Sequence, residues 1–148
     1  ELTPNRHELV KFNRIQFYLL NICGNILTST GAASIACCGR QLQPLIPNTT
    51  APKHPPQVEE VDAEYYATVQ HEMRREHYLL FAACVNDDRV WLNRFYPEQS
   101  PNFRFPNMRG GGSLYLYCTE HGLIKYELDV LLNKDRRLPG KRRDSYER

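Results

Sequence analysis

SLYLYCTEHGLIKYE, residues 113–127, has the clearest secondary-structure pattern in the chain. Aliphatic and aromatic side chains alternate up to Cys118, and a second apolar run begins at Leu123. Between the two runs, Glu120-His121-Gly122 has the composition of a turn. Two such runs on either side of a short polar segment predict a β-hairpin.

A second β-rich segment lies near the start of the chain. Phe12 to Ser29 is rich in β-branched and aromatic residues, and Gly24-Asn25 interrupts it. This pattern predicts two strands that meet at a turn or bulge. A helix is the competing interpretation for Phe17–Leu20, because that run has no alternation.

The middle of the chain has a different pattern. Between Gln43 and Gln57, five of 15 residues are proline, which predicts an extended connector. From Val58 to Cys84, apolar residues recur near helical spacing and acidic residues gather in the first turns, which predicts an amphipathic helix. The apolar positions are Val61, Tyr65, Val69, Met73, Leu80, Phe81 and Cys84. An irregular aromatic loop is expected after this helix.

These predictions combine into an α+β fold in one domain of 148 residues. The expected parts are a mainly β core (9–30 and 109–133), a proline-rich connector (43–57), a helical and aromatic insertion (58–108) and a basic tail (134–148). The longest apolar stretch, Ile15–Ile22, falls short of the roughly 20 residues that a membrane span needs, so no span is expected.

Basic residues are concentrated in the last 15 positions. Residues 134–148 contain seven Lys and Arg against three Asp and Glu, whereas residues 58–100 contain nine acidic and four basic side chains. Pro139-Gly140 discourages a regular helix in the basic segment, so we expect a flexible tail. Its charge suits either phosphate contact through counterion release or a solubilising role.

The cysteines and histidines do not form a recognisable metal-binding motif. The five cysteines are an odd number and scattered, which favours a reducing or organellar compartment over secretion. Cys37-Cys38 with Cys118-x-x-His121 is a poor ligand pattern, because adjacent cysteines rarely face one ion. We therefore expect no metal site and no cofactor.

His71 and His77 resemble part of a zincin helix but have the wrong spacing. They lie six residues apart, about 240° around a regular helix, so they cannot share an ion there. No nucleophile elbow, phosphate-binding loop or paired-carboxylate motif is found, and we expect no catalytic residues and no enzyme. A zinc or thiol enzyme stays an alternative that requires Cys37, Cys118 and His121 to converge.

Two segments together suggest a family. The front segment contains Leu9-Val10-Lys11-Phe12, Gln16 and Gly24-Asn25-Ile26-Leu27, and the back segment contains Gly112–Leu116 and His121–Glu127. In this order they resemble the bacterial-type large-subunit ribosomal protein "L twenty-seven" family. The resemblance covers roughly 40 residues, and about 80 others lie between the two segments. Because of these intervening residues, the chain resembles a mitochondrial version of this family with a large insertion.

The resemblance implies a structural constituent of the mitochondrial large ribosomal subunit in the mitochondrial matrix. Its partners would be ribosomal RNA and neighbouring ribosomal proteins, with no small-molecule substrate. Basic side chains would neutralise phosphates, and the acidic helix would contact proteins. The implied RNA-binding residues are Arg6, Lys11, Arg14, Arg109, Lys125, Arg136, Arg137, Lys141, Arg142 and Arg143. The alternative is an accessory protein–protein subunit of another mitochondrial complex, such as a respiratory complex.

Overall fold

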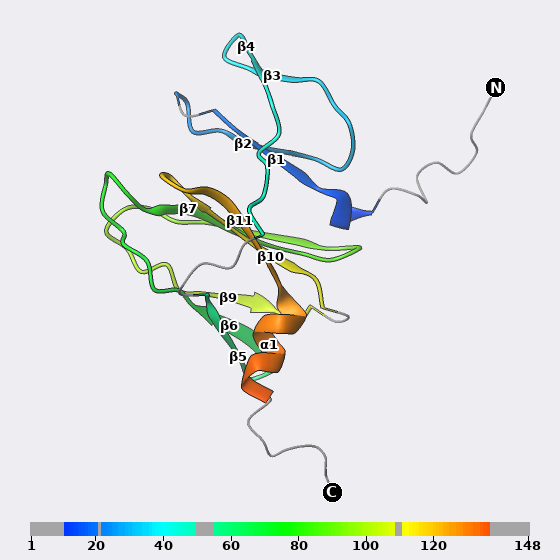
Figure 1. Cartoon of the computed structure of the whole chain (residues 1–148), viewed down its shortest axis with the longest axis vertical. Helices are drawn as coiled ribbons and strands as arrows, with labels where there is room; N and C mark the ends of the chain where they lie inside the picture. The colour runs from blue at the N-terminus through cyan, green and yellow to red at the C-terminus, as the bar shows by residue number, and fades with distance from the viewer. Residues whose placement is uncertain (1–10, 21, 50–54, 109–110, 137–148) are drawn as a thin grey trace, which may run out of the picture.

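The computed structural model describes residues 11–20, 22–49, 55–108 and 111–136 (Figure 1). Within these ranges the chain forms eleven β-strands and one α-helix. The elements are β1 Gln16–Leu19, β2 Ile26–Ser29, β3 Ile35–Cys37, β4 Arg40–Leu42, β5 Gln57–Val61, β6 Glu64–Thr68, β7 Leu79–Val85, β8 Val90–Arg94, β9 Phe103–Pro106, β10 Ser113–Cys118, β11 Gly122–Glu127 and α1 Leu128–Arg136. Phe12–Arg14 forms one turn of 3₁₀-helix before β1.

The centre of the fold is a four-stranded antiparallel sheet with the order β11-β10-β7-β8. All seven residues of β7 are buried. In β10, Leu114 and Leu116 belong to one core cluster, and Tyr115 and Tyr117 belong to another. Because alternate residues of a strand point to opposite faces, the central sheet is covered on both faces.

Each face has its own cover. On one face lie the three-stranded sheet β5-β6-β9 and α1, which contribute Tyr65, Phe105 and Leu131 to the same core cluster as Leu114 (Figure 1). On the other face, β1 contributes Phe17, whose ring centroid lies 5.4 Å from that of Phe81. The small hairpins β1-β2 and β3-β4 form the end of the molecule at the top of Figure 1.

The structure confirms both hairpins that the sequence predicts. β10 and β11 pair antiparallel from Ser113↔Glu127 to Cys118↔Gly122. β1 and β2 pair antiparallel, so the competing helix over Phe17–Leu20 is wrong. Gly24 lies in the connection between them with φ +71°, a conformation that glycine adopts without a steric penalty.

The predicted helix from Val58 to Cys84 is wrong, because this segment forms β5, β6, a loop and β7. The misleading feature was the spacing of four between Val61, Tyr65 and Val69. Four is near one helical turn, but Val61 and Tyr65 lie on different strands, on either side of the β5-β6 turn. Tyr65 and Val69 share one face of the extended chain because four is a multiple of two. A turn at Asp62-Ala63, with φ of 53° and 67°, joins β5 to β6.

The expected α+β fold with an inserted amphipathic helix is therefore wrong, and the described chain is nearly all β. The insertion 58–108 supplies most of the two larger sheets, including β9 in the predicted aromatic loop. The described helix α1 begins inside the segment expected as β core and runs into the segment expected as basic tail. No helix among the described residues is long and apolar enough to cross a membrane.

The β5-β6 turn allows a test that separates hairpin from helix. We expect Ala63→Gly to raise the free energy of unfolding by about 0.5 kcal/mol, since relief of the left-handed backbone outweighs the entropy that glycine adds. Ala67→Gly, in buried β6, is the control and lowers it by about 1 kcal/mol. Urea denaturation measures both. In a helix, Ala63→Gly would instead destabilise by about 1 kcal/mol.

Candidate metal centre

The loop between β6 and β7 brings two histidines together. Arg74 and His77 exchange backbone hydrogen bonds of 3.1 and 3.0 Å, which close a tight turn through Arg75 and Glu76. The chain reverses at this turn, so His77 returns towards His71, and their ring centroids lie 4.6 Å apart. Two residues whose spacing is wrong for one helix face thus become neighbours in a loop.

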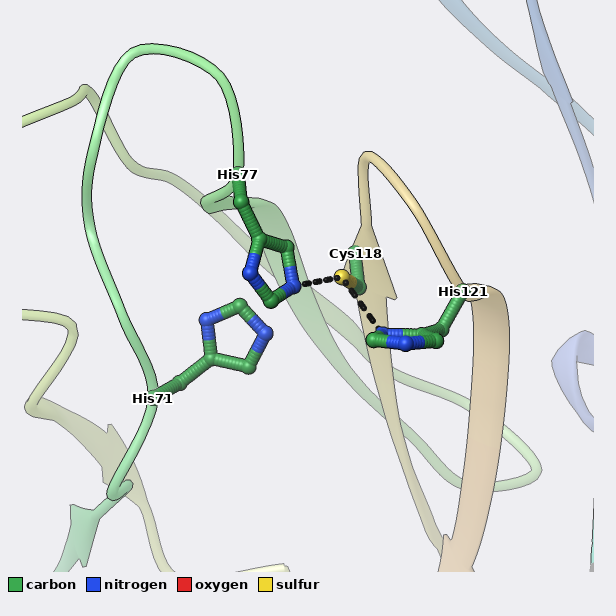
Figure 2. A group of neighbouring side chains, drawn as sticks. All are labelled: His71, His77, Cys118 and His121. Atoms are coloured by element: carbon green, nitrogen blue, oxygen red, sulfur yellow. Dashed lines mark hydrogen bonds between the residues drawn. The ribbon is translucent and has the colours of Figure 1, made fainter.

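The β10-β11 hairpin supplies two more side chains at the same place. Cys118 is the last residue of β10 and is fully buried, and His121 follows in the exposed turn. The Sγ of Cys118 lies 3.1 Å from Nε2 of His77 and 3.3 Å from Nδ1 of His121. Figure 2 shows the sulfur between these two rings, with His71 beside them. We call His71, His77, Cys118 and His121 the His/Cys site.

Backbone and side-chain contacts hold the two loops in register. Thr119 donates its backbone N–H to the carbonyl oxygen of Tyr78 at 3.0 Å, and Tyr78 donates its own to the Thr119 hydroxyl at 3.2 Å. The register of β7 and β10 places Cys118 opposite Leu79. The end of β10 and the residues before β7 therefore meet at one edge of the central sheet.

Hydrogen bonds set the tautomers of His71 and His77. Nδ1 of His71 lies 2.6 Å from the carbonyl oxygen of Glu72, which only accepts, so Nδ1 carries the proton. Nδ1 of His77 lies 3.3 Å from the Glu72 carboxylate, which also accepts. Both rings therefore turn an unprotonated Nε2 towards the site. A partner that fixes the second ring nitrogen is typical of metal-binding histidines.

Burial and hydrogen bonds favour a neutral His71 and a charged Glu72. Burial lowers the pKa of His71, although the hydrogen bond to the Glu72 backbone opposes that shift. The hydrogen bond from Arg74 lowers the pKa of Glu72 to about 2, and the hydrogen bond from His77 adds to this. At neutral pH, His71 therefore offers a lone pair, and Glu72 is an anion that accepts from His77.

The His/Cys site fits a transition-metal ion. The four potential ligand atoms all lie within 4.8 Å of one another. Nε2 of His71 is buried and has no hydrogen-bond partner in the described structure, a costly state that an ion would relieve. Imidazole with thiolate suits zinc, copper or iron rather than magnesium or calcium. The argument that His71 and His77 cannot share an ion applies to one regular helix, whereas the two residues lie in a loop where their rings are neighbours.

The alternative grouping of Cys37 with Cys118 and His121 is also wrong. Cys37 lies instead with Cys23 and Cys38 near the β3-β4 hairpin. The sequence contained one usable signal, Cys118-x-x-His121 at the turn of a predicted hairpin. His77 and Cys118 are 41 residues apart, and no local pattern indicates that they meet.

The residues assigned to RNA contact do not all lie within the described structure. Arg6, Arg109, Arg137, Lys141, Arg142 and Arg143 lie outside the described residues. Lys11 forms an ion pair with Asp87 at 3.7 Å, and Lys125 with Glu127 at 3.8 Å. Arg14 and Lys125 line one surface hollow, and Arg136 lies in the last turn of α1.

Comparison with known proteins finds similarity to desulfoferrodoxins. No family model matches the chain. It is 29% identical to the desulfoferrodoxin of Desulfarculus baarsii over 122 residues, which cover 77% of this chain and 97% of that protein. It is also 29% identical to a desulfoferrodoxin homolog of Archaeoglobus fulgidus over 117 residues, which cover 74% and 94%.

A solved structure shares the fold. The superoxide reductase from Treponema pallidum superposes with a TM-score of 0.66 and 22% identity, over 77% of this chain and 98% of that protein. At this identity the likeness shows the fold alone. The agreement in overall fold matches the nearly all-β architecture described above.

These findings overturn the resemblance to "L twenty-seven", the ribosomal function that it implied and the alternative of an accessory subunit. The similarity to desulfoferrodoxins covers about three times as much of the chain as the ribosomal segments did. Three further predictions are wrong. They are that the protein is no enzyme, that its partners are rRNA and ribosomal proteins, and that it has no small-molecule substrate. A superoxide reductase is an enzyme with a small-molecule substrate. Placement in the mitochondrial matrix stays a prediction.

The contact between Glu72 and His77 predicts an effect on metal affinity. We expect Glu72→Gln to weaken Co²⁺ binding roughly tenfold, because the amide is a poorer acceptor for the Nδ1–H of His77. Glu76→Gln is the matched control, since Glu76 contacts Arg74 of the same loop at 3.3 Å. Co²⁺ titration followed by thiolate charge-transfer absorbance measures both. Equal losses in the two variants would contradict a specific role for Glu72.

The lowered pKa of His71 predicts acid sensitivity of the metal-free protein. As the pH falls below 6.5, the unfolded chain binds a proton that folded His71 resists, so the free energy of unfolding falls until the pH passes the lowered pKa. Urea unfolding at about pH 7.5 and about pH 5.5 measures the loss, which His71→Gln should reduce. Glu72 titrates far below this window. An unchanged loss in His71→Gln would refute the assignment.

Proposed function

We propose that this chain binds iron at the His/Cys site and reduces superoxide. The observation that carries the proposal is the convergence of three imidazoles and one thiol within 4.8 Å on this fold. Superoxide reduction is a one-electron reaction, so it needs an ion that changes its oxidation state. Zinc does not, whereas iron accepts the same imidazole and thiolate ligands.

The residues that would hold the ion are His71, His77, Cys118 and His121. Bound ferrous iron supplies the single electron, which an external reductant restores. The balanced reaction combines one superoxide, one electron and two protons into one molecule of hydrogen peroxide. Three neutral imidazoles and one thiolate contribute a single negative charge. This charge would stabilise the ferric state of the ion less than the charges of several thiolates would.

The surrounding groups orient and stabilise the ligands. Glu72 holds His77 through Nδ1, and the Glu72 carbonyl oxygen holds His71. The backbone N–H of Glu120 donates to the Cys118 sulfur at 3.4 Å and stabilises negative charge there. Cys118 is buried, but His121 is exposed at the turn. A small anion from solvent therefore approaches the site from the His121 side.

The comparisons support this proposal in two ways. The relatives that match most of the chain are named desulfoferrodoxins, which is a name for iron-containing proteins. The structure that shares the fold is a superoxide reductase. The alignment with the first relative covers 97% of that protein, so the chain spans nearly its whole length.

The test is the stoichiometry of superoxide consumption. Purified protein is loaded with Fe²⁺ and reduced with ascorbate, and superoxide is then added as a pulse. A reductase forms one hydrogen peroxide per superoxide and no dioxygen, whereas dismutation forms one peroxide per two superoxides. We expect reductase stoichiometry, and we expect Cys118→Ser to lower the rate at least tenfold because it removes the thiolate ligand.

Cys38→Ser is the matched control, since it removes an exposed thiol outside the His/Cys site. Its rate should stay within about twofold of the unchanged protein. Dismutase stoichiometry, or equal losses in the two cysteine variants, would overturn the proposal. Retention of zinc with no superoxide consumption after iron loading would also overturn it.

A further inference from the structure

Three further thiols lie close together at the end of the fold opposite α1. Cys23 lies between β1 and β2, Cys37 ends β3, and Cys38 lies in the β3-β4 turn. The sulfurs of Cys23 and Cys37 are 3.4 Å apart, and those of Cys37 and Cys38 are 3.8 Å apart. Cys23 and Cys38 are exposed and Cys37 is half-buried. We call these residues the thiol cluster.

The cluster is not completed by a fourth potential ligand. Among the residues that the structure describes, no further histidine, cysteine or carboxylate joins the three sulfurs. Structural zinc is almost always held by four protein ligands. Three sulfurs in near contact, on two exposed cysteines and one half-buried cysteine, are instead an arrangement from which a disulfide forms.

The geometry favours Cys23–Cys37 over the pair of sequence neighbours. Cys37 and Cys38 are sequence neighbours, and their Cα atoms are held about 3.8 Å apart by a trans peptide, below the usual disulfide range of roughly 4.4–6.8 Å. Cys38 also has φ +53° in the tight turn. Cys23 and Cys37 come from different hairpins and are free of this constraint. Their sulfurs are also the closer pair.

The surroundings favour Cys23 as the reactive thiolate. Hydrogen bonding from the Asn25 backbone, with a smaller contribution from Cys37, lowers the pKa of Cys23. The pKa of Cys38 is instead raised to about 11 by hydrogen bonds with Cys23 and Cys37. The Asn25 side chain donates to the Cys37 sulfur at 3.1 Å and holds it beside Cys23. Thiolate, rather than thiol, is the nucleophile towards peroxide.

We propose that Cys23 and Cys37 form a reversible disulfide when the protein meets hydrogen peroxide. The Cys23 thiolate attacks one peroxide oxygen, the O–O bond breaks, and with one proton a sulfenic acid and water result. The Cys37 thiol then displaces the hydroxyl as a second water, and the S–S bond forms. The two sulfurs lose two electrons, which reduce the peroxide. External thiol reverses the reaction.

The bond would join two hairpins that share only a small core. Tyr18, Leu20 and Leu42 are the buried members of that core, and Cys37 packs against it. Arg94, at the end of β8, donates to the carbonyl oxygen of Gly24 at 3.2 Å, next to Cys23. Oxidation would therefore fasten the β1-β2 connection to β3 at a place already attached to the central sheet.

Peroxide treatment of the full chain tests the inference. After oxidation, free thiols are blocked with N-ethylmaleimide, and peptides are mapped by mass spectrometry. We expect a Cys23–Cys37 cross-link that dithiothreitol removes, and we expect Cys38→Ser to form it at a rate within about twofold. In the double variant Cys37→Ser with Cys38→Ser, dimedone should label Cys23 as its sulfenic acid. Buried Cys84, whose pKa burial raises, should stay unlabelled.

Three results would overturn the inference. The first is a cross-link that joins Cys38 in place of Cys23 or Cys37. The second is oxidation of all three thiols to sulfinic acids without a cross-link. The third is a metal ion retained by the thiol cluster and lost in Cys23→Ser, with no cross-link formed. Because peroxide is added directly, the result does not depend on the activity proposed for the His/Cys site.

Discussion

The antiparallel pairing of β7 with β10 is the interaction on which the rest of the structure depends. Both strands are buried on both faces, and the three-stranded sheet, α1 and β1 all pack against the sheet they form. The register that places Cys118 opposite Leu79 also brings the loop before β7 to the end of β10. The core that stabilises the fold thus positions the His/Cys site, and a register shift would separate its two halves.

The His/Cys site combines a rigid edge with a loop that is fixed mainly by polar contacts. Cys118 belongs to the sheet, whereas His71 and His77 depend on the Arg74–His77 turn and on Glu72. Nε2 of His71 is buried without a partner, so the metal-free fold holds a polar atom at a cost in free energy. Metal binding would offset this cost, which couples occupancy of the site to the stability of the loop.

The sequence predicts the parts of the fold that depend on local pattern. The β10-β11 hairpin has alternation and a turn within 15 residues, and the structure confirms it. Val58–Cys84 misleads because apolar residues spaced by four fit a helix, whereas in the structure a turn separates Val61 from Tyr65, and pairing with neighbouring strands decides the fold of the segment. The sequence did not predict the His/Cys site because His71 and His77 are incompatible on one helix, whereas in the structure they meet in a loop.

The five cysteines show why counting them predicts so little. Cys84 is buried in β7, and burial alone raises its pKa, so it acts as a small core residue. Cys118 is equally buried but lies at a strand end, where two imidazoles reach its sulfur. Cys23 is exposed and has backbone and thiol neighbours that favour its thiolate. Cysteine therefore serves in packing, metal binding or thiol chemistry according to its burial and its immediate neighbours. Tertiary structure sets both the burial and the neighbours.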